Sequence, residues 1–220
     1  MVYLWFIASD YQMLYLYEEK NIKKTICELF AGVCGFRLEF DRLDSNWKTV
    51  WFSQYEPSRN NQNAHSCYVS HFGDLVDIKK EYHTNDDISI VNKEMIPNHT
   101  LLVGGFPCQD YSVANSSSKG IEGKKGVFWW QIYEILKIKK TNFCIFENVD
   151  RLLKSPSKQQ GRDFGIILGC LAEQNYSVEW RVVNAADYGS AQKRKRTFIF
   201  AYKNDTNYRK EIKKYELKKF

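Results

Sequence analysis

Short apolar runs alternate with helical patterns along this chain of 220 residues, and this alternation restricts the fold more than any other feature. The runs Thr25–Phe30, Thr49–Ser53, Leu101–Val103 and Phe143–Phe146 have the length and composition of buried strands. Helical segments between successive buried strands are typical of a mostly parallel sheet that is flanked by helices. We therefore predict an α/β fold in one domain, which is the size class that a chain of this length allows.

Helical patterns follow several of these runs. We expect one helix to end near Asp41 and two others to cover Val127–Ile138 and Phe164–Leu171, while Pro57 stands where a further helix would begin. The segment Asp110–Gly126 is rich in Ser, Asn, Gly and Lys and has no periodicity, and a loop of that length inside a compact domain is usually functional or disordered.

The chain divides into three parts. Its last two apolar runs, Tyr176–Val183 and Thr197–Tyr202, are close enough to pair through their connecting loop, which predicts a final antiparallel strand. Residues 1–24 form an N-terminal extension and residues 25–202 the domain itself. Residues 203–220 are a basic tail, for which we expect either a solvated helix or a frayed end.

Charge and hydropathy exclude several classes of protein. The 32 basic residues outnumber the 26 acidic ones, so the net charge is +6, which favours an anionic partner. Mean hydropathy is -0.50 and no uncharged apolar run approaches about 18 residues, so we expect no membrane span. The start, Met1–Tyr17, lacks the basic region and the cleavage site of a signal peptide.

Six cysteines occur without any C-x-x-C pair or Cys/His cluster at zinc spacing, so we expect neither a disulfide framework nor a metal site. Free thiols in apolar runs behave as small core residues. Five are therefore expected to be buried and inert: Cys27, Cys34, Cys67, Cys144 and Cys170. Cys108 differs because it follows a strand in the turn Gly104–Gln109, where backbone amides can stabilise a reactive thiolate.

Polar and glycine-containing turns follow the predicted strands. The stretch Phe30–Phe36 has the glycines of a strand-to-helix turn, where backbone can approach a ligand closely, although closure of a helix onto a sheet explains such a turn equally well. Gln54 and Glu56 follow the second strand, at the usual place of a ribose-binding side chain. In Asp86-Asp87 we expect an acceptor for an adenine amino group.

A carboxylate and a basic cluster follow the later strands. Glu147-Asn148-Val149 comes directly after a strand, hence at the same sheet edge as Cys108, where ligands gather in open α/β sheets. Before the final strand, alternation places Arg194 and Arg196 on one face, where they can reach a phosphate. A basic cluster alone is more often a solvated loop.

Together these motifs resemble the DNA (cytosine-5) methyltransferases: the glycine turn, Gly105-Phe106-Pro107-Cys108-Gln109, Glu147-Asn148-Val149 and Gln192-x-Arg194-x-Arg196 occur in the family's order. The resemblance covers residues 25–202. It implies a Rossmann-like fold, S-adenosylmethionine as methyl donor, a cytosine flipped out of double-stranded DNA as acceptor, a restriction-modification system, and a cytoplasmic, nucleoid-associated protein.

The resemblance also implies roles for the reacting residues. Cys108 would attack C6 of the cytosine, and Glu147 would hydrogen-bond and protonate N3, so that C5 becomes nucleophilic. Arg194 and Arg196 would hold the flipped nucleotide and its phosphate. The segment 110–126 matches the family's loop that closes over the DNA.

For the donor, the resemblance implies a pocket of six residues, with Asp87 near the adenine and Glu56, or Gln54, near the ribose. This chain departs from the family at Cys34, where a second glycine is usual, and at Phe128, where leucine is common. The implied donor residues are Phe30, Gly32, Gly35, Glu56, Asp87 and Phe106.

Family members continue past the final strand into a target-recognition region and two further motifs, whereas about eighteen residues follow Tyr202 here. The leading interpretation is thus a catalytic region that works with a second chain carrying recognition. The alternatives are a catalytically silent remnant that binds the donor or DNA, and a methyltransferase that acts on cytosine in RNA.

Overall fold

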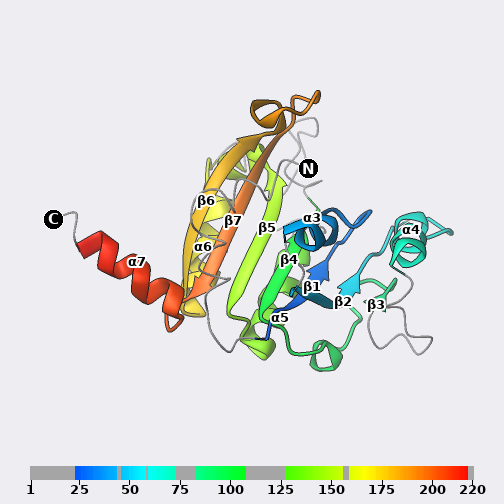
Figure 1. Cartoon of the computed structure of the whole chain (residues 1–220), viewed down its shortest axis with the longest axis horizontal. Coiled ribbons are helices and arrows are strands. Elements are labelled where there is room, and N and C mark those ends of the chain that lie inside the picture. Colours follow the sequence, from blue (N-terminus) through cyan, green and yellow to red (C-terminus); the bar gives the residue numbers. More distant parts are fainter. Residues whose placement is uncertain are drawn as a thin grey trace.

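A seven-stranded sheet in the order β3-β2-β1-β4-β5-β7-β6 forms the centre of the molecule (Figure 1). The computed structural model describes residues 23–43, 46–57, 59–72, 83–107, 127–155 and 159–217. Neighbours from β3 to β5 pair in parallel, and β7 runs antiparallel to both β5 and β6. The predicted α/β fold, a mostly parallel sheet with a final antiparallel strand, is confirmed. The strands are β1 (Thr25–Leu29), β2 (Lys48–Ser53), β3 (His83–Thr84), β4 (Leu101–Gly105), β5 (Phe143–Val149), β6 (Tyr176–Asn184) and β7 (Lys195–Lys203).

Helices cover both faces of the sheet. Sequence patterns place most of them correctly, but Pro57 does not begin one, because α4 starts six residues later at Asn63. The helices are α3 (Gly35–Leu43), α4 (Asn63–His71), α5 (Val127–Lys139), α6 (Arg162–Glu173) and α7 (Asn207–Leu217), with short 3₁₀ turns η2 (Lys93–Met95), η5 (Asp150–Lys154) and η6 (Ala185–Tyr188).

Alternating strand residues supply two separate apolar cores. On β4, Leu102 belongs to the core under α5 and α6, whereas Leu101 and Val103 belong to the core that packs against α3. This is the two-residue period of a strand that is covered on both faces. The central strands are therefore buried on both faces, whereas the edge strand β6 exposes Trp180 and Val182.

The basic tail is a helix that is anchored to the domain. Tyr208 of α7 is buried, and its ring packs against Phe143, Phe200 and Tyr202 of the neighbouring strands. Of the two predictions for the tail, a helix or a frayed end, the helix is therefore the one that forms. Within the described parts of the chain, no helix has the length and apolar character needed to cross a membrane.

The thiols are less uniform than the sequence predicts. Cys27, Cys34 and Cys144 are buried, as expected. Cys67 is exposed and Cys170 is only half-buried, because both lie on helices that present one face to solvent. Cys108 lies outside the residues that the structure describes, as does the segment 110–126.

Candidate active site

The glycine turn after β1 is held against the end of β2. The Gly32 amide donates to Oε1 of Gln54 at 2.7 Å, and the Ala31 amide donates to the Ser53 carbonyl at 3.0 Å. Gly32 has a φ of 57°. An ideal Cβ at Gly32 or Gly35 would meet no atom within 4 Å, so open space adjoins the backbone of this turn. A ligand can therefore approach these two glycines closely.

Cys34 adopts a φ of 66°, in the left-handed region that explains why glycine is usual here. Its side chain is buried with Tyr68 and Phe72 beneath α4, and burial raises the pKa of the thiol to about 11. The thiol thus packs into the core behind the turn, so it does not crowd a ligand in front of it.

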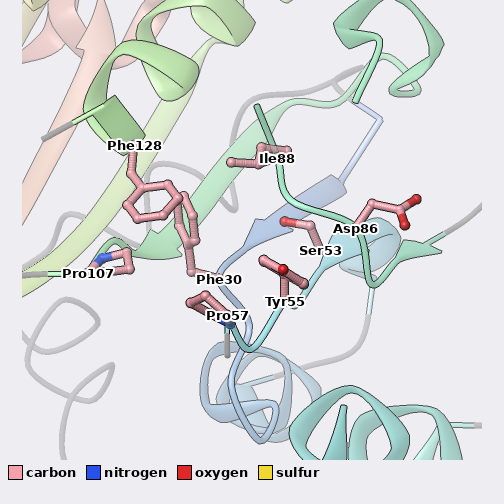
Figure 2. Close-up of a pocket in the computed structure, with 8 residues that line it drawn as sticks. All are labelled: Phe30, Ser53, Tyr55, Pro57, Asp86, Ile88, Pro107 and Phe128. Carbon is pink, nitrogen blue, oxygen red and sulfur yellow. The ribbon is translucent and has the colours of Figure 1, made fainter. Parts of the chain in front are cut away.

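A pocket opens beside this turn, at the ends of β1, β2 and β4 (Figure 2). One wall is aromatic: the rings of Phe30 and Phe128 meet edge to face with centroids 5.4 Å apart. Ser53 and Asp86 are the polar residues of the lining, beside the aromatic Tyr55. The lining is mostly apolar, with few polar groups, which is typical of a small-molecule site. The lining residues are Phe30, Ser53, Tyr55, Pro57, Asp86, Ile88, Pro107 and Phe128.

Of the six expected donor residues, Phe30 lines this pocket, whereas Gly32, Gly35, Glu56, Asp87 and Phe106 do not. Phe106 is buried in the core against Trp129 and Phe146, and it is the next residue, Pro107, that reaches the pocket. Glu56 uses its carboxylate to accept from the Ala64 amide at 2.8 Å, which caps the start of α4.

The Asp87 carboxylate accepts from the Ser89 amide at 2.9 Å, and the neighbouring Asp86 belongs to the pocket lining, with its Oδ2 accepting from the Thr84 hydroxyl at 3.0 Å. Gln54 is likewise occupied, because its Oε1 accepts from Gly32. The pocket gains Tyr55 instead, a residue that sequence reasoning passed over although it lies between Gln54 and Glu56.

The ends of β4 and β5 lie side by side. Gly105 pairs with Glu147 in the register, and an ideal Cβ at Gly105 would lie 3.1 Å from Oε2 of Glu147. The buried Asn148 donates from Nδ2 to the carbonyl of Phe106 at 3.2 Å. This hydrogen bond fixes the backbone at Phe106, two residues before Cys108 in the sequence. The sequence indicates this role of Asn148 only through its position next to Glu147.

Glu147 is gripped by an arginine from the antiparallel strand β7. Nε of Arg196 lies 2.7 Å from Oε1 of Glu147, and the two side chains are 18% and 25% exposed, respectively. Burial raises the pKa of Glu147, while the positive charges of Arg196 and Arg194 oppose that rise. The site therefore holds a carboxyl group with a raised pKa and solvent access, which suits proton transfer to a bound molecule.

Two features define the class of protein. A pocket beside a glycine turn at the carboxyl ends of parallel strands is the ligand site of Rossmann-like α/β proteins. A half-buried carboxyl with paired arginines stands on the same edge, and this combination fits an enzyme that acts on a second, anionic substrate. Among the described residues, no three His, Cys, Asp or Glu side chains cluster as a metal site.

The sequence profile of the C-5 cytosine-specific DNA methylases matches residues 24–220, and the chain belongs to this family. It is 49% identical over 202 residues to the Type II methyltransferase M.Sau3AI of Staphylococcus aureus, covering 90% of this chain and 48% of that protein. It is 32% identical over 180 residues to M.HhaI of Haemophilus parahaemolyticus, covering 82% and 49%. The chain thus spans about half the length of these curated relatives.

Solved structures agree on the fold. The Entamoeba histolytica methyltransferase EhMeth matches with a TM-score of 0.65 at 22% identity, over 83% of this chain and 53% of that one. A Spodoptera frugiperda DNMT2 variant matches with a TM-score of 0.63 at 18% identity, over 83% and 51%.

Proposed function

We propose that this chain is the catalytic part of a DNA (cytosine-5) methyltransferase of the restriction-modification type, acting on the DNA of the nucleoid in the cytoplasm. The observation that carries the proposal is the carboxyl group of Glu147, which is raised in pKa, paired with Arg196 and adjacent in register to Gly105. Three residues beyond Gly105 the sequence has Cys108.

The pocket fits the donor by its chemistry. Phe30 and Phe128 offer aromatic surface for a purine ring, and Asp86, whose Oδ2 accepts from the Thr84 hydroxyl, has a second carboxylate oxygen for an amino group or a ribose hydroxyl. The open space at Gly32 and Gly35 leaves room for the amino-acid portion beside backbone amides. When bound here, S-adenosylmethionine supplies an electrophilic methyl group.

The chain's own residues activate the acceptor. The thiolate of Cys108 adds to C6 of an extruded cytosine, and Glu147 donates a proton to N3, so negative charge does not accumulate on the ring. C5 then becomes nucleophilic enough to take the methyl group, with the neutral thioether of the donor as leaving group. Loss of the C5 proton to solvent, expulsion of the thiolate and return of the N3 proton to Glu147 then restore the ring. Arg196 orients the Glu147 carboxyl, and the exposed Arg194 is available to the nucleotide's phosphate.

This chain spans about half the length of the curated relatives it matches, and a second chain is one proposed source of target recognition. The competing proposal is a silent remnant that binds the donor or DNA without transfer. Both are tested by incubating the chain, alone and with the protein encoded next to it, with labelled S-adenosylmethionine and either duplex DNA or RNA.

In this assay Cys108→Ser is expected to abolish transfer and to leave donor affinity within about twofold, because a hydroxyl adds to C6 far less readily than a thiolate. Cys67→Ser, at an exposed thiol on α4, is the matched control and should retain full activity. Transfer by Cys108→Ser at the wild-type rate would refute the nucleophile. Donor binding without transfer under every condition would favour the remnant, and label in RNA alone would change the acceptor.

A further inference from the structure

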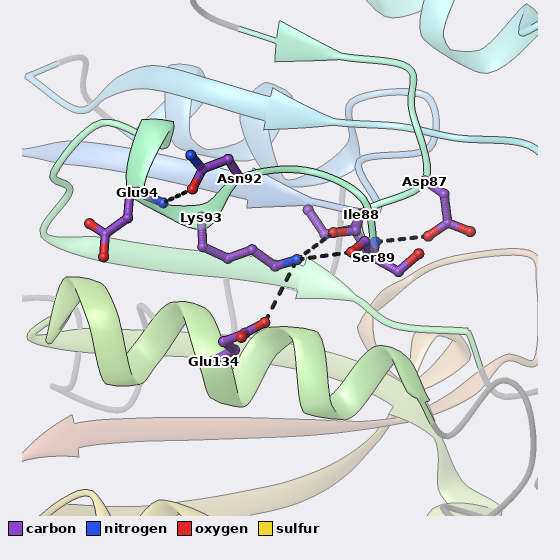
Figure 3. A network of polar contacts seen from close by, with 7 residues as sticks. All are labelled: Asp87, Ile88, Ser89, Asn92, Lys93, Glu94 and Glu134. Carbon is purple, nitrogen blue, oxygen red and sulfur yellow. Dashed lines mark hydrogen bonds and ion pairs between the residues drawn. The ribbon is translucent and has the colours of Figure 1, made fainter.

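Lys93 is a buried lysine whose ammonium group points at backbone rather than at solvent (Figure 3). Only 7% of its side chain is exposed. From η2, Nζ donates to the Ile88 carbonyl at 2.8 Å and reaches the Ser89 carbonyl at 3.5 Å. An ammonium is strongly hydrated in water, so burying it against carbonyl oxygens is costly unless those contacts are kept.

The carbonyls that Lys93 holds belong to one wall of the pocket. Asp86 and Ile88 line it, and the side chain of Ile88 also enters the core, where it is 3% exposed. Local hydrogen bonds close this turn on its outer side, from the Ser89 amide to the Asp87 carboxylate and from the Ile90 amide to the Asp87 carbonyl. On the side of the core, Lys93 supplies the hydrogen bond to the Ile88 carbonyl.

Lys93 also connects that wall to the opposite one. Its Nζ lies 3.7 Å from Oε2 of Glu134 on α5, and Nζ of Lys139, at the end of α5, donates to the Glu94 carbonyl at 2.9 Å. The first turn of α5 carries Phe128, which faces Asp86 and Ile88 across the pocket. The Lys93 ammonium therefore lies between the pocket wall of residues 86–89 and α5, the helix that carries Phe128.

We propose that Lys93 is a positioning residue for the methyl-donor pocket: its buried ammonium holds the Ile88 and Ser89 carbonyls and thereby sets where Asp86 and Ile88 stand relative to Phe128. The proposal rests on the donor site proposed above. Lys93 does not line the pocket, so its effect on a ligand passes through the backbone of residues 86–89.

The test compares Lys93→Met, which keeps the stem and removes the charge, with Lys93→Arg, which keeps the charge. Affinity for S-adenosylmethionine is measured by calorimetry, and amide hydrogen exchange at residues 86–91 is measured in the unliganded protein. Lys93→Met is expected to weaken binding about tenfold, equal to about 1.4 kcal/mol, and to speed exchange at the Ser89 and Ile90 amides. Lys93→Arg should remain within about threefold in both readouts.

Glu134→Gln is the matched control, because the Glu134 side chain is 55% exposed and exposed ion pairs contribute little. It should leave affinity within about twofold. If Lys93→Met does not fold, Lys93→Gln, which keeps a donor without charge, takes its place in both measurements.

The two readouts separate the possible failures. If the wild-type chain binds no donor, the proposed donor site fails, while faster exchange at 86–91 in the variant still shows that Lys93 holds this turn. Unchanged exchange in Lys93→Met would overturn the positioning role whatever the binding result. Faster exchange with unchanged affinity would also overturn it, because the turn would then be held without consequence for the pocket.

Discussion

Two glutamates in the same sheet show how burial can serve structure in one place and chemistry in another. Glu28 on β1 is fully buried and accepts from the Tyr68 hydroxyl at 2.8 Å. Glu147 on β5 is paired with Arg196 and keeps a quarter of its side chain exposed. Burial raises the pKa of both carboxyls, that of Glu28 to about 7. A raised pKa alone therefore does not identify a catalytic acid.

The difference between them is access. Glu28 lies under the glycine turn, enclosed by α3 and α4, so that its proton has no route to a bound molecule; Tyr68 and the nearby Arg37 offset part of the burial. Glu147 lies near the carboxyl end of β5. Its neighbour across the strands is Gly105, the last residue of β4, which has no side chain to cover it. We expect Glu28 to affect the stability of the fold and Glu147 to affect the rate of methyl transfer.

The largest expected effect is on catalysis at Glu147. Glu147→Gln retains the shape and the contact with Arg196 but cannot give up a proton, so methyl transfer should fall by about 10² to 10⁴-fold. The melting temperature should change by only a few degrees. Transfer rates for the wild type and variant under single-turnover conditions measure this, and equal rates would show that Glu147 is not the acid.

The next effect is the pH dependence of stability from Glu28. Its pKa is about 7 in the folded protein against 4.5 ordinarily, so the folded state keeps a proton that the unfolded state loses in this window. The free energy of unfolding should therefore fall as pH rises from 4.5 to 7, by about 3 kcal/mol. Urea unfolding at several pH values should show this slope, and Glu28→Gln should remove it.

Methyl transfer provides the control for that prediction. Glu28→Gln still accepts from Tyr68 and should retain activity within about threefold at pH 7.5. If this variant keeps the wild-type slope, the titrating group is another one. If it instead loses activity to the extent of Glu147→Gln, the division between the two glutamates is wrong.

The adjacent glycines Gly104 and Gly105 allow a smaller test of the same contrast between a structural and a catalytic role. An alanine Cβ at Gly104 would lie 2.8 Å from the Leu29 carbonyl oxygen, which is backbone within the sheet and cannot yield. Gly104→Ala should therefore cost about 1–3 kcal/mol of stability. At Gly105 the Cβ would meet the Glu147 carboxylate at 3.1 Å, a side chain that can move.

Gly105→Ala should accordingly cost less than about 1 kcal/mol but lower methyl transfer, because it displaces Glu147 from Arg196. Thermal unfolding and transfer rates measured on both variants test the pair. A large loss of stability in Gly105→Ala, or no loss in Gly104→Ala, would contradict a structural role for Gly104 and a catalytic one for Gly105.

Most strands and the residues that follow them are predictable from the sequence, whereas the order of the strands in the sheet and the short β3 come from the structure. Apolar runs of strand length separated by helical patterns require a mostly parallel sheet, and in such a sheet the carboxyl ends share one edge. That is sufficient to bring the segments after Val103 and Phe146, and hence the motifs around Cys108 and Glu147, to the same edge. It also locates the glycine turn beside them.

Tertiary packing decided which side chains face the pocket. Asp86 lines it while Asp87 closes a turn, Phe106 is buried while Pro107 lines it, and Glu56 caps α4. Asp86 and Asp87 have the same chemistry and differ only in where the side chain points and in which group it bonds. These depend on contacts with distant segments, which spacing along the chain does not encode.

The same holds for the charges. Sequence alone marks Lys93 and Glu28 as ordinary ionisable residues, and only the folded chain shows one holding carbonyls of the pocket wall and the other enclosed beneath the glycine turn. What the sequence determined is thus the sheet and the edge at which chemistry is placed, because periodicity and strand polarity are local properties. What the tertiary structure decided is how each carboxyl, amide and ammonium group is used, because desolvation and hydrogen bonding depend on neighbours that are far away along the chain.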